Sequence, residues 1–263
     1  MGALLGSVAI HHQLPTWGQI GWVLLAMFGA RSAAMGLNRL IDRVSDAKNP
    51  RTSNRAIPAG LLKIGEVVVF IIVSFTLLFW AAFKLDPLAV KLLPIAVIML
   101  VVYSYTKRFT WLCHVVLGLT IALAPLGGWA AVSGKVDWTA MVFFLTITFW
   151  VAGFDIIYSC QDVEFDTKEG LYSIPVRFGV AKSLLIAKVM HIMTAVGFIA
   201  LYILTDLGSW YAAGMIVAFI MLFYEHYIVS PDDLSRLQTS FFWMNGVLSI
   251  VVFSFTLIDL FVR

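Results

Sequence analysis

Residues 64–84 read IGEVVVFIIVSFTLLFWAAFK, and this stretch decides the class of fold. Its only charged residues are Glu66 near the start and Lys84 at the end. A helix needs about 20 consecutive apolar residues to cross the hydrocarbon core of a bilayer. In lipid, a helix satisfies its own backbone hydrogen bonds, which an open sheet edge does not. The stretch therefore predicts a transmembrane helix.

Similar stretches recur along all 263 residues of the chain, which is 61% hydrophobic and 13% charged. Soluble domains are about 45–50% apolar and about 25% charged. We therefore expect an all-α, polytopic transmembrane bundle, formed by a single domain over residues 1–263. The expected spans are residues 1–12, 17–40, 64–84, 88–106, 111–132, 138–158, 182–205, 208–228 and 238–261. The first span is too short to cross alone, and since it starts abruptly at Met1 we expect its beginning to be truncated.

The distribution of basic residues predicts the orientation of the bundle. Of the 18 Lys and Arg residues, fourteen lie in or beside the loops that follow spans two, four, six and eight. The other four are Lys84, Lys91, Lys135 and Arg263. Because cytoplasmic loops are enriched in Lys and Arg, we expect the first set to face the cytoplasm from a cell (inner) membrane. Such loops also account for the net charge of +3, so we expect no nucleic-acid partner.

Two acidic motifs lie at the ends of spans that should open on this same side. The first, NRLIDRVSD at residues 38–46, has a helical spacing that predicts one stripe formed by Asn38, Asp42 and Asp46. The second, DIIYSCQDVEFD at residues 155–166, predicts a second stripe formed by Asp155, Tyr158, Asp162 and Asp166. The two stripes are expected to face one another.

A carboxylate carried by a membrane-spanning helix is unfavourable in free energy unless a cation is bound to it. Each carboxylate costs about 2.5–3.5 kcal/mol at the centre of a membrane helix. Mg²⁺ prefers oxygen ligands and binds through one or two carboxylates together with substrate phosphates, so the stripes suit Mg²⁺ ions clamped on a diphosphate. Three alternatives remain: ordinary interfacial aspartates, the ion path of a transporter, and a purely structural membrane subunit. An ion path would place carboxylates at several depths, whereas these gather on one side.

Basic and aromatic residues follow the first motif and the fourth span. The loop AKNPRTSNRAIPAG at residues 47–60 offers Arg51 and Arg55, whose guanidinium groups can grip a phosphate or a carboxylate through paired hydrogen bonds. YSYTKRFT at residues 103–110 places Tyr103 and Lys107 one helical turn apart. The alternatives are topological anchors for the basic residues and an aromatic belt for the tyrosine.

The cysteines and histidines show no spacing of a disulfide framework or a zinc site. We expect packing or interfacial roles for Cys113, Cys160, His11, His12, His114, His191 and His226.

Taken together, the motifs resemble those of the UbiA superfamily of intramembrane prenyltransferases. Asn38, Asp42 and Asp46 match N-x-x-x-D-x-x-x-D; Tyr103 and Lys107 match Y-x-x-x-K; and D-x-x-Y-x-x-x-D-x-x-x-D is matched by Asp155, Tyr158, Asp162 and Asp166. The resemblance implies nine transmembrane helices around a central cavity, with a Mg²⁺-dependent site near the cytoplasmic face. Arg39 departs from the pattern, because many relatives carry an acidic residue there, and the usual N-terminal arm is missing.

Within this superfamily, the loop is similar to those of enzymes that prenylate 4-hydroxybenzoate on the way to ubiquinone. The second motif is also similar to a group thought to prenylate a related aromatic acid in the futalosine route to menaquinone. The expected partners are a polyprenyl diphosphate, an aromatic acid acceptor such as 4-hydroxybenzoate and the lipid bilayer.

The resemblance also suggests a role for each motif residue. Asp42, Asp46, Asp162 and Asp166 would hold Mg²⁺, with Asn38 and Asp155 completing or orienting that shell. Lys107 would neutralise the leaving diphosphate, while Tyr103 and Tyr158 would stabilise an allylic cation. Arg51 and Arg55 would grip the carboxylate of the acceptor.

Overall fold

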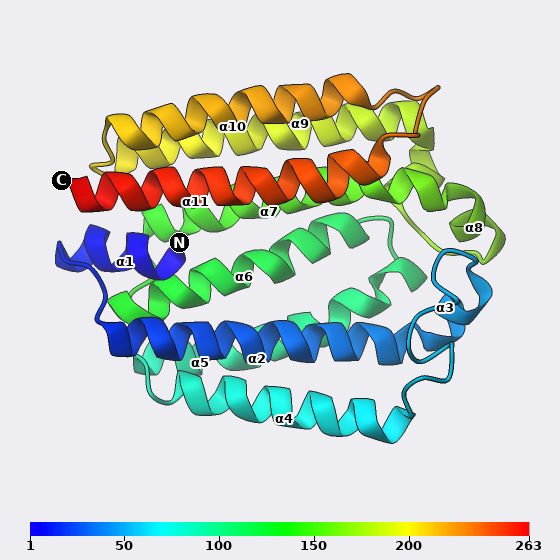
Figure 1. Ribbon diagram of the computed structural model, residues 1–263, viewed down its shortest axis with the longest axis horizontal. Helices are drawn as coiled ribbons and strands as arrows, with labels where there is room; N and C mark the ends of the chain where they lie inside the picture. The colour runs from blue at the N-terminus through cyan, green and yellow to red at the C-terminus, as the bar shows by residue number, and fades with distance from the viewer. Residues whose placement is uncertain (263) are drawn as a thin grey trace.

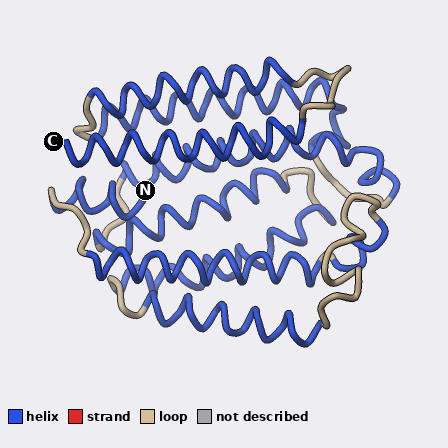
Figure 2. Tube along the Cα trace, viewed as in Figure 1, coloured by secondary structure: helices blue, strands red, loops and turns tan. Residues whose placement is uncertain are grey.

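The computed structural model describes residues 1–262, apart from the side chains of residues 239–241. The described part is an all-helical bundle (Figures 1 and 2). A short helix, α1 (Gly2–His11), precedes eight helices that are long and apolar enough to cross a membrane. These eight are built on α2 (Trp17–Ile41), α4 (Ile64–Ala82), α5 (Pro87–Val102), α6 (Cys113–Ser133), α7 (Trp138–Ser159), α9 (Ile174–Leu204), α10 (Ser209–Ile228) and α11 (Asn245–Val262). The predicted polytopic bundle is confirmed.

Shorter helices extend or connect several spans. They are α3 (Arg43–Lys48), the 3₁₀ helices η1 (Tyr103–Arg108) and η2 (Cys160–Asp162), α8 (Val163–Lys168) and the π-helical turn η3 (Thr239–Met244). Figure 1 places α3 and α8 together at one end of the bundle, while α1 and the C-terminal end of α11 lie at the other. Arg263 falls outside the described residues.

The seventh span begins earlier than the sequence predicted. We expected it at residue 182, but α9 starts at Ile174, where the Ser173 side chain accepts a hydrogen bond from the backbone N–H of Val176. Gly179 then interrupts the helix with φ 77° and ψ 163°, a conformation that glycine adopts without the penalty of a Cβ atom. The first turns of α9 are therefore separated by a kink from the apolar run that signalled the span.

Small residues let neighbouring helices approach closely, as is common in membranes. A Cβ atom on Gly29 of α2 would lie 2.6 Å from the carbonyl oxygen of Ser74 in α4. One on Gly118 of α6 would lie 2.4 Å from the carbonyl oxygen of Thr148 in α7. The helix pairs α2–α4 and α6–α7 are accordingly packed against each other.

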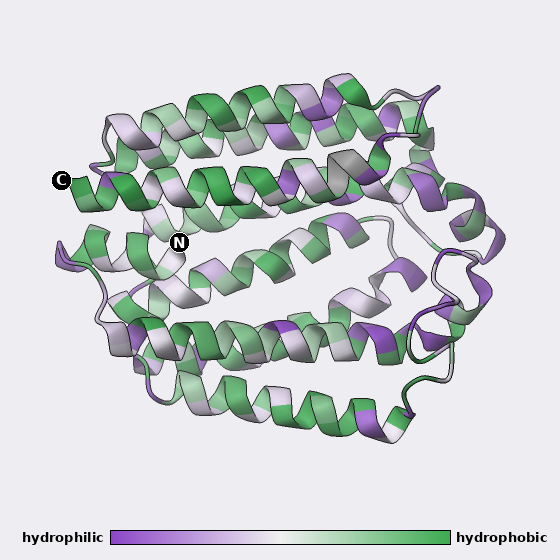
Figure 3. Ribbon diagram, in the orientation of Figure 1, coloured by the Kyte–Doolittle hydropathy of each residue, from purple (hydrophilic) through white to green (hydrophobic). Residues whose placement is uncertain are grey.

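Large apolar side chains fill the rest of the interior. Trp129, Phe143 and Phe198 are almost completely buried in a core that joins α6, α7 and α9. Figure 3 shows hydrophobic residues along the lengths of the helices and hydrophilic residues gathered where α3 and α8 lie. The packed bundle thus holds its polar groups mainly at one end, where the two acidic motifs are found.

Candidate active site

A cavity of about 270 Å³ opens at the end of the bundle that carries α3 and α8. All eleven candidate site residues line it: Asn38, Asp42, Asp46, Arg51, Arg55, Tyr103, Lys107, Asp155, Tyr158, Asp162 and Asp166. They come from α2, α3, the following loop, η1, α7, η2 and α8. Both motifs therefore open on one side of the bundle and line the same cavity, as expected.

The residues of each motif line the cavity together, as the predicted stripes require, but the helix that carries them is not continuous. In the first motif, α2 ends at Ile41, and Asp42 is the N-cap of α3, with φ −91° and ψ 3°. In the second, α7 ends at Ser159, and Asp162 is the N-cap of α8. A short new helix thus begins directly after Asp42 in the first motif and after the 3₁₀ helix η2 in the second.

The breaks change which helix end the last aspartate of each motif faces. A carboxylate at a helix C-terminus faces the negative end of the macrodipole, whereas one at an N-terminus faces the positive end. The breaks place Asp46 in the first turn of α3 and Asp166 in the first turn of α8. The two motifs therefore adopt the same local design from opposite sides of the cavity.

Hydrogen bonds fix the first motif. Asn38 Nδ2 donates to Asp42 Oδ2 over 2.8 Å, and Arg108 Nη2 lies 3.3 Å from Asp42 Oδ1. Burial raises the pKa of the Asp42 carboxyl above its ordinary value, although the charge of Arg108 opposes this. Arg55 Nη1 donates to Asp46 Oδ1 over 2.6 Å.

Arg51 connects the two motifs across the cavity. Its Nε and Nη2 atoms donate to the two carboxylate oxygens of Asp162, over 3.0 and 2.7 Å. Its Nη1 atom donates to the Tyr158 hydroxyl over 3.1 Å, and the guanidinium lies 5.4 Å from the centre of that ring. Burial would lower the pKa of Arg51, but the hydrogen bond and charge of Asp162 outweigh it and raise the pKa. Arg51 and Arg55 are thus both engaged by aspartates.

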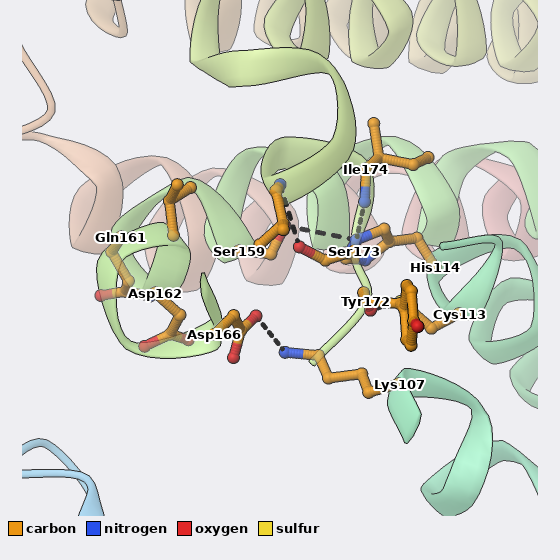
Figure 4. A network of polar contacts seen from close by, with 12 residues as sticks. Lys107, Cys113, His114, Ser159, Gln161, Asp162, Asp166, Tyr172, Ser173 and Ile174 are labelled. Atoms are coloured by element: carbon orange, nitrogen blue, oxygen red, sulfur yellow. Dashed lines mark hydrogen bonds and ion pairs between the residues drawn. The ribbon is translucent and has the colours of Figure 1, made fainter. Parts of the chain in front are cut away.

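Tyr103 and Lys107 lie on the 3₁₀ helix η1, not on an α-helical turn as expected. Residues four apart do not stack above one another in a 3₁₀ helix, which repeats every three residues. Lys107 pairs with Asp166 (Figure 4), with 3.2 Å between Nζ and Oδ2. The Tyr103 hydroxyl donates to the carbonyl oxygen of Ala34 over 3.4 Å. Both residues nevertheless line the cavity.

Two further residues contact the motif aspartates and were not predicted from the sequence. Arg108 pairs with Asp42. In the sequence, Arg108 is one of several basic residues at a loop, so it indicated only the orientation of the chain in the membrane. His114 was expected only to pack. It is fully buried, and its Nδ1 atom lies 2.6 Å from Asp155 Oδ2. Because α6 brings His114 to Asp155 from 41 residues away, no local spacing revealed the contact.

The site fits a divalent cation held jointly with a substrate. Among residues 1–262, no three His, Cys, Asp or Glu side chains are arranged to hold a metal by themselves. Mg²⁺ that bridges substrate phosphates needs only one or two carboxylates from the protein. One oxygen already lacks a partner: Asp46 Oδ2 is buried without a hydrogen bond among the described residues. A buried carboxylate oxygen of this kind is costly unless a ligand compensates it.

An apolar groove of about 130 Å³ lies between α2, α4, α5 and α6. Ala30, Leu100 and Thr120 are among its lining residues. The polar cavity is lined by Tyr103, three residues after Leu100, and by Leu117, three residues before Thr120. The chain thus offers an apolar groove next to a charged cavity.

Comparison with known proteins agrees with this geometry. The model of the UbiA prenyltransferase family matches residues 1–247. The 4-hydroxybenzoate octaprenyltransferase of Vibrio campbellii is 26% identical over 239 residues, which cover 91% of this chain and 84% of that protein. The mitochondrial 4-hydroxybenzoate polyprenyltransferase of Schizosaccharomyces pombe is 32% identical over 164 residues, or 59% of this chain and 46% of that protein.

Solved structures show the same architecture. The apo structure of a UbiA homologue from Aeropyrum pernix has a TM-score of 0.90 and 26% identity, covering 98% of this chain and 95% of its own. A UbiA homologue from Archaeoglobus fulgidus bound to DMAPP and Mg²⁺ has a TM-score of 0.70 and 18% identity, covering 95% of this chain and 93% of its own. The second similarity concerns the fold alone.

Proposed function

The chain belongs to the UbiA prenyltransferase family, and on that premise we propose that it transfers a polyprenyl group from polyprenyl diphosphate to an aromatic acid such as 4-hydroxybenzoate. The reaction is Mg²⁺-dependent and serves respiratory quinone biosynthesis, leading to ubiquinone or menaquinone. Its site faces the cytoplasm from the cell (inner) membrane. The names of the Vibrio and Schizosaccharomyces relatives support this choice of acceptor.

The observation that carries the proposal is the convergence of both acidic motifs on one cavity, where Asp46 Oδ2 is buried without a hydrogen-bond partner among the described residues. Asp42 and Asp46 would hold Mg²⁺ from one side, and Asp162 and Asp166 from the other, with Asn38 orienting Asp42. When bound, the metal would neutralise the diphosphate and stabilise its departure as a Lewis acid.

The remaining roles fall to the basic and aromatic side chains. Lys107 and Arg108 neutralise the leaving diphosphate from the η1 side of the cavity. Tyr103 and Tyr158 stabilise the allylic cation over their ring faces. The isoprenoid chain lies in the neighbouring apolar groove, which excludes water that would trap the cation.

Arg51 and Arg55 hold the carboxylate of the acceptor away from the diphosphate. In the structure they pair with Asp162 and Asp46. We infer an exchange of partners, in which each guanidinium group leaves its aspartate to bind the carboxylate of the acceptor. An ion-coupled transporter is disfavoured, because the cavity carboxylates gather at one end of the bundle and are joined by arginines.

The direct test uses the purified full chain in nanodiscs, with a polyprenyl diphosphate, 4-hydroxybenzoate and Mg²⁺. Mass spectrometry should detect an acid heavier by one polyprenyl group, formed only when all three components are present. Release of diphosphate without any prenylated acid would reject the aromatic acid as the acceptor.

A further inference from the structure

Asp155 differs from the other carboxylates of the cavity. Asp42, Asp46, Asp162 and Asp166 each pair with an arginine or a lysine. Within the described part of the chain, Asp155 Oδ2 instead lies 2.6 Å from Nδ1 of the His114 imidazole. Its carboxylate is therefore oriented by a histidine and not by a flexible lysine or arginine side chain.

The imidazole of His114 is held in a defined orientation. The backbone N–H of Ile174 donates to His114 Nε2 over 3.4 Å (Figure 4), and Ser159 Oγ lies 3.5 Å from the same atom. A backbone N–H can only donate, so Nε2 accepts, and the ring proton is assigned to Nδ1. Nδ1 then donates to Asp155 Oδ2 over 2.6 Å. This hydrogen bond uses one oxygen and fixes the direction of the whole carboxylate.

The position of Asp155 suits a reaction step that the metal ligands do not perform. It lies on α7, before Asp162 in the chain, and its side chain lines the cavity and remains partly exposed. His114 is fully buried at the start of α6. The carboxylate is therefore open to the cavity on one side and held by a buried imidazole on the other.

We propose that Asp155 takes up the proton lost by the aromatic ring and that His114 is its positioning residue, an inference that rests on the proposed function. The C–O bond of the donor breaks, and its electron pair leaves with the diphosphate. A ring carbon beside the phenolic carbon forms a C–C bond to the allylic carbon. The C–H bond at that ring carbon then breaks, its electrons restore the aromatic ring, and its proton passes to Asp155.

Two substitutions separate this role from simple packing. His114→Asn keeps an N–H donor near the place of Nδ1, whereas His114→Leu keeps a similar volume and lacks the donor. Partners behind a reacting group typically contribute about 10–100-fold to activity. We expect His114→Leu to lower kcat by about that factor and His114→Asn to recover most of the loss. Both variants should bind an unreactive prenyl thiodiphosphate as the wild type does.

The decisive readout is a kinetic isotope effect, measured in nanodiscs with 4-hydroxybenzoate deuterated beside the phenolic carbon. In the wild type, loss of diphosphate should limit the rate, and deuterium should have no effect. In His114→Leu, proton loss becomes slow, and a primary isotope effect should appear. Asp155→Asn should show the same isotope effect, and its kcat should fall by about 10²–10⁴-fold, as expected for a missing general base. If His114→Leu does not fold, Asp155→Asn provides the test.

The inference is overturned if His114→Leu and Asp155→Asn lose activity without any isotope effect, or if His114→Asn is as impaired as His114→Leu. A wild type that binds the thiodiphosphate but prenylates no phenolic acid would contradict the proposed function itself. The thiodiphosphate measurement therefore distinguishes the two failures.

Discussion

Arg51 and Asp162 are joined across the cavity by two parallel hydrogen bonds, although they are 111 residues apart in the chain. This geometry is the strong, bidentate form of an arginine–carboxylate contact. It ties the loop that follows the first motif to the second motif. If Asp162 holds a metal and Arg51 grips an acceptor, as we propose, this contact would open when the ligands bind.

The first prediction concerns the arginine of the same loop that pairs with Asp46. Arg55→Lys should raise the KM for the aromatic acid more than the KM for the prenyl diphosphate, because lysine does not reproduce the paired hydrogen bonds of a guanidinium. A lost charge-assisted contact of about 1.5–3 kcal/mol corresponds to an increase of about 10–100-fold. Steady-state kinetics in nanodiscs, with each substrate varied in turn, would measure both constants.

Arg43→Lys is the matched control, since Arg43 is exposed on α3 and does not line the cavity. Substitution of Lys107 by Gln should show the opposite preference and weaken the donor first. If Arg55→Lys impaired only the donor, Arg55 would be a diphosphate ligand.

The second prediction concerns the four aspartates that we assign to the metal. Asp42→Asn, Asp46→Asn, Asp162→Asn and Asp166→Asn should each nearly abolish turnover, because a neutral amide is a much weaker ligand for a hard cation. The proteins should still insert, since the substitution removes a charge. Initial rates at saturating Mg²⁺ would test this, and Glu164→Gln on the exposed face of α8 serves as the control. Wild-type rates in both Asp42→Asn and Asp162→Asn would exclude a shared clamp.

The third prediction is the orientation of the bundle. Reporter fusions near Asn54 and Lys168 should report the cytoplasm, because Lys and Arg are enriched at that end. Fusions near Asp86 and Lys135 should report the opposite side. If Asn54 and Lys168 were found on different sides of the membrane, a single site built from both motifs would be impossible.

The fourth prediction concerns the packing of α6 against α7. Gly118→Ala should destabilise the protein by about 1–3 kcal/mol, the usual cost of forcing extra volume into a packed interior, because its Cβ would meet the carbonyl oxygen of Thr148. Gly127→Ala on the same helix is the control, since a Cβ there has no neighbour within 4 Å. Thermal unfolding in detergent would show a lower Tm for Gly118→Ala alone.

Much of this fold was predictable because each span is a predominantly apolar run, and a membrane-spanning segment has few alternatives to a helix in lipid. The residues that line the cavity were also predictable, since the spacing within each motif is short. The helix breaks at Asp42 and Asp162 were not, because i, i+4 spacing describes a continuous helix and a helix break equally well.

Contacts between distant segments were the other limit. Arg51 with Asp162 and His114 with Asp155 join residues that only the packing of α6, α7 and the loops brings together. The residue type indicated that each arginine would bind an anion, but nothing in the local sequence identified which carboxylate it would bind. The first turns of α9 were also not predicted. The kink at Gly179 and the polar residues near it separate these turns from the apolar run of the helix.

The central claim, that both motifs clamp one diphosphate through Mg²⁺, is tested most directly by calorimetric binding of an unreactive prenyl thiodiphosphate. The wild type should bind it with Mg²⁺ and lose binding when EDTA removes the metal. Asp46→Asn and Asp162→Asn, one from each motif, should each weaken Mg²⁺-dependent binding severely, while Glu164→Gln should not. Undiminished binding in EDTA, or wild-type affinity in either aspartate variant, would contradict the account.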